Sequence, residues 1–111
     1  MATFISLVNF TQQGLAKIQQ SPERLEISKQ MFASMGAELK AFYLVMGRYD
    51  AVIISEAPDE DTVVKLMLTI GSAGAIRTET MRAWPEADYK AIISSLHEFG
   101  APRVPPGQSP R

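Results

Sequence analysis

Residues 41–54 contain a β-hairpin whose two strands carry apolar side chains on both faces. The turn is centred on Gly47-Arg48, because glycine first in a two-residue turn supplies the positive φ that the turn requires. Pairing outward gives six facing pairs: Met46–Tyr49, Val45–Asp50, Leu44–Ala51, Tyr43–Val52, Phe42–Ile53 and Ala41–Ile54. A longer loop would keep these faces, because side chains alternate along a strand. Since a sheet that is apolar on both sides needs cover on both sides, the hairpin constrains architecture and assembly but names no reaction.

The composition is that of an ordinary globular protein, and it argues against several classes of function. Of the 111 residues, 46% are hydrophobic and 21% are charged, and the net charge is −1. Without a basic surface, the chain is not expected to bind nucleic acid. The absence of cysteine excludes disulfides and thiolate metal sites. With no apolar run long enough for a membrane and no signal-peptide pattern, we expect a cytoplasmic protein without metal or cofactor.

Local patterns predict one domain, residues 1–100, followed by a proline-rich tail that is expected to be disordered, residues 101–111. The predicted strands are 4–10, 39–46, 49–56 and 75–84. A short helical turn follows Thr11, and Ser21-Pro22-Glu23 begins a helix that ends at Gly36. The next helix begins at Asp59 and buries a stripe of four residues: Val63, Leu66, Met67 and Ile70. A last helix starts at Pro85-Glu86.

This order of elements predicts an α+β fold with βαββαβ topology and an added C-terminal helix. Right-handed crossovers give a four-stranded antiparallel sheet in the order 4-1-3-2, with two helices on one face. The central strands, 4–10 and 49–56, are the ones that are apolar on both sides. The last helix could cover part of the second face, but one amphipathic helix is too narrow to cover four strands. We therefore expect a second copy of the chain to cover it in a symmetric homodimer or a higher multiple.

Three separated segments resemble the GYD-domain family, small bacterial proteins named for a Gly-Tyr-Asp signature. The signature appears as Gly47-Arg48-Tyr49-Asp50, supported by Phe4–Thr11 and by Arg77–Ala83. The resemblance runs over about residues 2–85. It implies a ferredoxin-like fold of the dimeric α/β-barrel type, and it implies no established activity.

The hairpin is also similar, more loosely, to the effector-binding domain of feast/famine transcription regulators, which bind amino acids at subunit interfaces. Antibiotic-biosynthesis monooxygenases, which act without metal or flavin, are similar in architecture alone.

Four polar residues are candidates for a ligand site at the subunit interface: Tyr43, Asp50, Arg77 and Glu79. Asp50 could anchor an amine or accept a proton, but an aspartate in this position more often accepts backbone hydrogen bonds. Arg77 and Glu79 could line a pocket, or they could form an ion pair on an edge strand or between subunits. Tyr43 could donate to a substrate oxygen or be a core residue.

Other conspicuous residues are better explained by structure. Tyr49 is expected on the face opposite Tyr43, and Trp84 is expected to hold the last helix against the sheet. His97 is the sole histidine, so no histidine-based metal site is expected. The acidic run that includes Asp59 is explained by a helix N-terminus.

Three functions remain open on the sequence. The first is a non-catalytic, homo-oligomeric module that binds a small, partly apolar molecule between two sheets. The second is a cofactor-independent enzyme, monooxygenase- or isomerase-like, with Asp50 or Glu79 as base and Tyr43 as donor. The third is a purely structural assembly unit.

Overall fold

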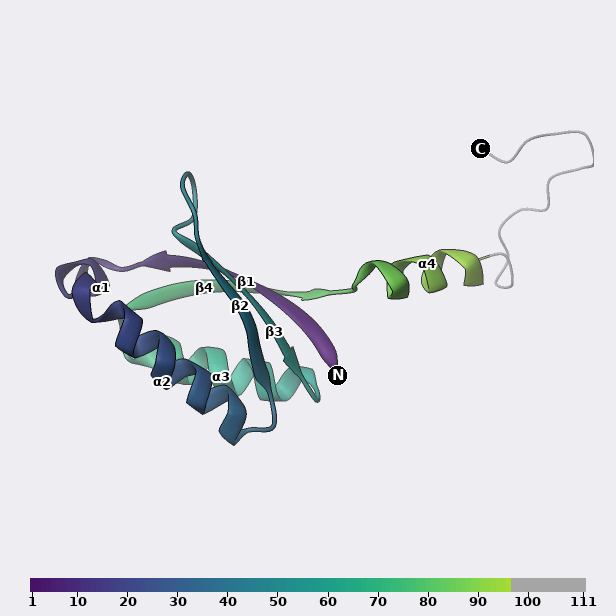
Figure 1. Cartoon of the computed structure of the whole chain (residues 1–111), viewed down its shortest axis with the longest axis horizontal. Coiled ribbons are helices and arrows are strands. Elements are labelled where there is room, and N and C mark those ends of the chain that lie inside the picture. Colours follow the sequence, from purple (N-terminus) through teal and green to yellow (C-terminus); the bar gives the residue numbers. More distant parts are fainter. Residues whose placement is uncertain (97–111) are drawn as a thin grey trace, which may run out of the picture.

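A computed structural model describes residues 1–96 of the chain (Figure 1). The elements, in order, are β1 (Ala2–Phe10), α1 (Gln12–Ala16), the 3₁₀ turn η1 (Ile18–Gln20), α2 (Ser21–Ser34), β2 (Glu38–Leu44), β3 (Ala51–Ala57), α3 (Glu60–Ser72), β4 (Ile76–Ala83) and α4 (Glu86–Ser95). His97, the domain boundary at residue 100 and the expected tail, 101–111, lie outside the described residues.

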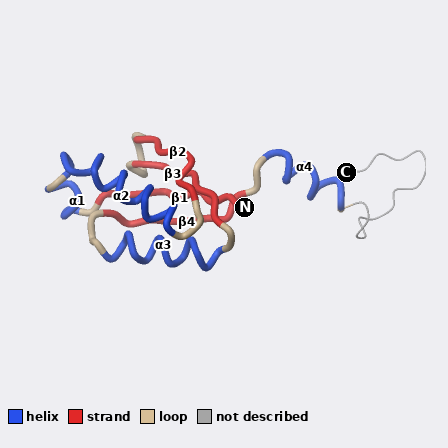
Figure 2. The backbone as a smooth tube through the Cα atoms, turned by 60° about the horizontal axis from the view of Figure 1, so that its bottom comes forward, coloured by secondary structure: helices blue, strands red, loops and turns tan. Residues whose placement is uncertain are grey.

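The four strands form one antiparallel sheet in the order β2-β3-β1-β4, which is the predicted order. The α+β architecture with βαββαβ topology is thereby confirmed, and β1 and β3 are the central strands (Figure 2). Four of the predicted hairpin pairs are present in the register of β2 and β3: Leu44–Ala51, Tyr43–Val52, Phe42–Ile53 and Ala41–Ile54. A register irregularity lies between Leu39 and Ala41.

The loop of this hairpin is longer than the predicted two-residue turn. The Val45 N–H donates to the Asp50 carbonyl at 2.9 Å, so residues 46–49 form the loop and Met46 does not pair with Tyr49. The reason lies on β1, because the Asp50 N–H donates to the Val8 carbonyl at 2.9 Å and ties the end of the loop to that strand. Gly47 has a φ of 108°, the positive value expected of it.

The core lies between the helices and one face of the sheet, which we call the helix face. Alternate residues of β1 and β3 point into it, as the two-residue period of a strand requires. The main buried cluster comprises Phe4, Phe32, Ala37, Ala57, Val63 and Leu66. Phe32 of α2 and Leu66 of α3 are completely buried, and the predicted stripe of α3 faces this cluster. Replacing such a phenylalanine with alanine costs roughly 3–5 kcal/mol, so these contacts hold the two layers together.

The helix termini follow the predicted signals with one exception. Asp59 caps α3 by accepting from the Thr62 N–H at 2.8 Å, and Gly36, with φ 72°, follows the end of α2. Ser21 is not the N-cap of α2 but its first residue, and Gln20 at the cap makes no side-chain hydrogen bond. The difference arises because η1 already turns the chain before Ser21, so the helix needs no hydroxyl cap there.

The last helix stands away from the sheet and covers neither face (Figures 1 and 2). None of the described residues of α4 is buried, and Tyr89, Ile92 and Ile93 are about half exposed. Trp84 is 53% exposed and packs against the Arg82 guanidinium, 4.6 Å from its ring centroid. The expectation that Trp84 holds this helix against the sheet is therefore wrong.

Candidate functional site

The side of the sheet opposite the helix face has no cover among residues 1–96, and we call it the open face (Figure 1). The alternation of the strands places these apolar side chains on it: Ile5, Leu7, Val52, Ile54 and Met81. The four predicted site residues belong to the same side of the sheet or border it. A partly apolar surface with a few polar groups is the usual make-up of a binding site.

Asp50 is occupied by the backbone of β1. Its Oδ2 accepts from the Phe10 N–H at 2.9 Å, while its own N–H donates to the Val8 carbonyl. Together these bonds extend the β1–β3 ladder past the end of the strand. The carboxylate therefore acts as a backbone partner, which was the alternative explanation offered by the sequence.

Glu79 lies on β4 opposite Leu7, and its Oε2 accepts a hydrogen bond from the Tyr49 hydroxyl at 3.0 Å. Tyr49 belongs to the β2–β3 loop, so its side chain reaches over β1 to the edge strand. The sequence prediction placed Tyr49 on the other face because it counted residue 49 as part of a strand, whereas Tyr49 lies in the loop, where side chains need not alternate. The pair of phenol and carboxylate that the structure brings together is therefore Tyr49–Glu79.

Tyr43 and Arg77 lie at opposite edges of the sheet. Tyr43 is on β2, 58% exposed, and Arg77 is on β4 opposite Asn9. Because β3 and β1 lie between these edges, one subunit does not gather the four predicted residues into a single site. Within residues 1–96, Arg77 makes no salt bridge, so its expected pairing with Glu79 is absent inside the subunit.

The described residues contain no group of three or more His, Cys, Asp or Glu side chains placed to hold a metal ion. Asp59, in the acidic run, accepts from both the hydroxyl and the N–H of Thr62, and these bonds lower the pKa of its carboxyl from its ordinary value. Among residues 1–96, no helix combines the length and apolarity that a membrane crossing requires.

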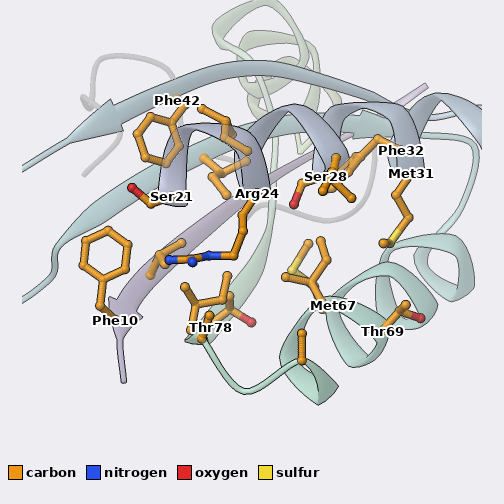
Figure 3. Close-up of a pocket in the computed structure, with 18 of the residues that line it drawn as sticks. Phe10, Ser21, Arg24, Ser28, Met31, Phe32, Phe42, Met67, Thr69 and Thr78 are labelled. Carbon is orange, nitrogen blue, oxygen red and sulfur yellow. The ribbon is translucent and has the colours of Figure 1, made fainter. Parts of the chain in front are cut away.

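A cavity of about 380 Å³ lies on the helix face, between α2 and α3, and it was not predicted from the sequence (Figure 3). Its one charged lining residue is Arg24, whose Nη2 is buried without a hydrogen-bond partner among residues 1–96. One feature of the sequence of α2 indicated this cavity. Polar residues recur at helical spacing on the inward side of that helix: Ser21, Arg24 and Ser28.

A comparison with known protein families identifies the family of this chain. The sequence model of the GYD domain matches residues 4–93, which is most of the chain. The chain belongs to the GYD-domain family. No solved structure matches it.

A GYD-type relative is known from Thermus thermophilus, where it is named "Glutamine synthetase and cystathionine beta-lyase binding protein". It is 38% identical to this chain over 94 residues, which cover 84% of the chain and 99% of the relative. The name describes that protein as a binder of two other proteins.

The GYD signature has a clear place in the structure. Gly47 supplies the positive φ of the loop, Tyr49 reaches Glu79 on β4, and Asp50 bonds to β1. The signature of this GYD-family chain thus fastens the β2–β3 loop to β1, which is next to β3 in the sheet, and to β4, the edge strand beyond it. Its contacts account for these three residues by structure, without assigning them a reaction.

Proposed function

We propose that this GYD-family chain is a non-catalytic binding module that acts through protein–protein association. The observation that carries the proposal is the uncovered open face, with apolar side chains on both central strands, beside an α4 that buries none of its described residues. A stable subunit would gain free energy by removing this surface from water, at roughly 25 cal/mol per Å² of apolar area.

The first occupant of the open face in this proposal is a second copy of the chain. A two-fold interface needs a surface that complements itself, and the open face carries both signs of charge together with its apolar centre. Arg77 and Glu79 lie two residues apart on β4, so their side chains share the open face. Each would meet the opposite charge of the other subunit there. The side chains of α4 would then find cover in the assembly that they lack within one subunit.

The second partner class is a metabolic enzyme, by analogy with the relative that is named for binding glutamine synthetase and cystathionine β-lyase. Its alignment covers nearly the whole relative, so the likeness involves the complete domain. We extend partner binding of this kind to the present chain. Such partners would also place the chain in the cytoplasm, which fractionation of its host would test.

The decisive experiment measures binding between purified proteins. The chain is immobilised, and glutamine synthetase and cystathionine β-lyase from its own host are passed over it, with serum albumin as the negative control. We expect saturable binding of at least one enzyme, and light scattering of the free chain to give the mass of a dimer or a multiple. A strictly monomeric chain that binds neither enzyme would overturn the proposal.

A single variant connects the two parts of this proposal. Val52→Lys places a charge in the middle of the open face, where burial against a second copy would be costly. We expect the variant to remain folded and to become monomeric at micromolar concentration. Leu68→Lys, at a residue of α3 that is 69% exposed, is the matched control and should keep the oligomer.

A small molecule at the subunit interface remains part of the proposal, with Tyr43, Asp50, Arg77 and Glu79 contributed from two chains. The alternative of a cofactor-independent enzyme is favoured by one observation, the Tyr49–Glu79 hydrogen bond of 3.0 Å. In one subunit this pair is exposed to solvent, and Asp50 is occupied by the backbone. Both facts support binding over catalysis, because a general base works best where water is excluded.

A further inference from the structure

The cavity between α2 and α3 has the size of a small-molecule site. Its volume of about 380 Å³ falls within the range of roughly 300–1,000 Å³ that is typical of ligand pockets. Large apolar groups of its wall come from both helices and from β1 and β2: Phe10, Leu25, Phe32, Phe42, Met67 and Ile70. An occupant must therefore be apolar over most of its length.

Arg24 gives this apolar cavity a positive charge. Its side chain extends from α2 into the cavity, toward the side where Phe10 and Thr78 lie (Figure 3). Nη1 donates to the Lys17 carbonyl at 3.2 Å, whereas Nη2 is buried and has no hydrogen-bond partner among residues 1–96. No aspartate or glutamate of these residues lines the cavity. A guanidinium stays protonated, so Arg24 is always charged. In the described part of the chain it makes no salt bridge, and its charge therefore has no anion beside it.

We propose that the cavity binds a free carboxylic acid with an apolar tail. The carboxylate would pair with the Arg24 guanidinium, whose planar fork matches two oxygens, and the tail would lie between α2 and α3. Hydroxyl groups at Ser21, Ser28 and Thr78 also line the cavity and can donate to a carboxylate oxygen. The site lies on the helix face, so it does not depend on self-association through the open face.

The test uses the full chain and sodium decanoate, below its micellar concentration, in isothermal titration calorimetry. We expect one saturable site, and weaker binding of 1-decanol, which has the same tail without the charge. Arg24→Met keeps an apolar stem of similar length and should weaken decanoate binding by roughly 10- to 100-fold, the effect of losing a charge-assisted hydrogen bond. Equal binding by the two proteins would overturn the proposal.

The location of the ligand is read from the methionine methyl groups by NMR. Met31 lines the cavity, and Met81 is on the open face. Decanoate should shift the Met31 methyl signal and leave the Met81 signal unchanged. Arg48→Met, in the β2–β3 loop, is the matched control, because Arg48 is exposed and does not line the cavity. It should bind decanoate as the original chain does. A shift confined to Met81, or loss of binding in Arg48→Met, would overturn the assignment.

A second variant separates a ligand-binding arginine from a structural one. Ser28→Leu fills the cavity without changing the charge, and it should abolish decanoate binding. Without ligand, Arg24→Met should unfold at the same temperature as the original chain or a higher one, because it removes a guanidinium whose Nη2 is buried without a hydrogen-bond partner among residues 1–96. If Arg24→Met is destabilised and Ser28→Leu still binds decanoate, the cavity is not the proposed site.

Discussion

The Tyr49 hydroxyl donates a hydrogen bond to Glu79 Oε2 over 3.0 Å, and these residues lie on elements that are not neighbours in the sheet. Tyr49 is in the loop between β2 and β3, and Glu79 is on the opposite edge strand, β4. Their contact crosses over β1 on the open face. It makes one polar connection across a side of the sheet that is otherwise largely apolar.

The stability conferred by this contact is predicted to be small. Because the bond is exposed, Tyr49→Phe should lower the free energy of unfolding by no more than about 1 kcal/mol. A double-mutant cycle with Glu79→Gln, followed by urea denaturation at a concentration where the chain is monomeric, measures the coupling. A coupling well above about 2 kcal/mol would show that the pair is buried, contrary to the geometry of one subunit.

Gly14→Ala is predicted to destabilise the fold by roughly 1–3 kcal/mol, as overpacking does. A Cβ at Gly14 would lie against the Ala75 carbonyl oxygen, far inside normal contact distance, so α1 and the start of β4 would have to separate. Gly71→Ala in α3 is the matched control, since its Cβ would meet nothing within 4 Å. Denaturation should show the control to be more stable than the original chain by about 0.5–1 kcal/mol, the helix propensity difference.

Acid should remove the contribution of Asp59 to stability. The hydrogen bonds from the Thr62 hydroxyl and N–H lower the pKa of Asp59 in the folded chain below its unfolded value. A lowered folded pKa means that this stabilisation is fully present above the unfolded pKa and is lost as the pH falls through the folded value. Asp59→Asn also caps a helix but does not titrate. The advantage of the original chain over this variant at pH 6 should therefore shrink in strong acid, as measured by urea denaturation.

Two buried serines are predicted to differ in their response to alanine. Ser55 is fully buried on β3, and its hydroxyl has no hydrogen-bond partner among residues 1–96. Ser55→Ala should leave stability unchanged or raise it by up to about 1 kcal/mol, since an unpaired polar atom is removed. Ser6→Ala should cost about 1 kcal/mol, because the Ser6 hydroxyl lies 2.9 Å from that of Thr80. A larger loss in Ser55→Ala than in Ser6→Ala would contradict this.

The sheet could be predicted from the sequence because its register depends on local alternation. The pairs Tyr43–Val52 and Phe42–Ile53 follow once a turn near Gly47 is accepted, and the strand order follows from short right-handed crossovers. The loop length was missed because it is decided by a contact distant in sequence. Asp50 bonds to Val8 and Phe10, and no property of residues 45–50 indicates that partner.

The candidate sites were harder to predict for a physical reason. A set of polar residues on one face says nothing of how far apart their strands lie, and Tyr43 and Arg77 are separated by two strands. The cavity depends on how far α2 and α3 stand apart, which no periodicity encodes. Arg24 was hard to detect, because α2 separates its polar and apolar residues only weakly. The position of α4 likewise depends on contacts beyond its own pattern, because that pattern predicts burial without specifying the partner.

Consecutive residues of β3 carry their side chains on opposite sides of the sheet. Ile53 lines the cavity on the helix face, and Val52 and Ile54, one peptide bond away on either side, belong to the open face. A molecule that moves Ile53 must therefore move the backbone that carries the opposite surface. If filling the cavity alters the affinity of that surface for a partner, the partner must alter the affinity of the cavity by the same factor. The sheet would then couple ligand binding in the cavity to partner binding on the open face.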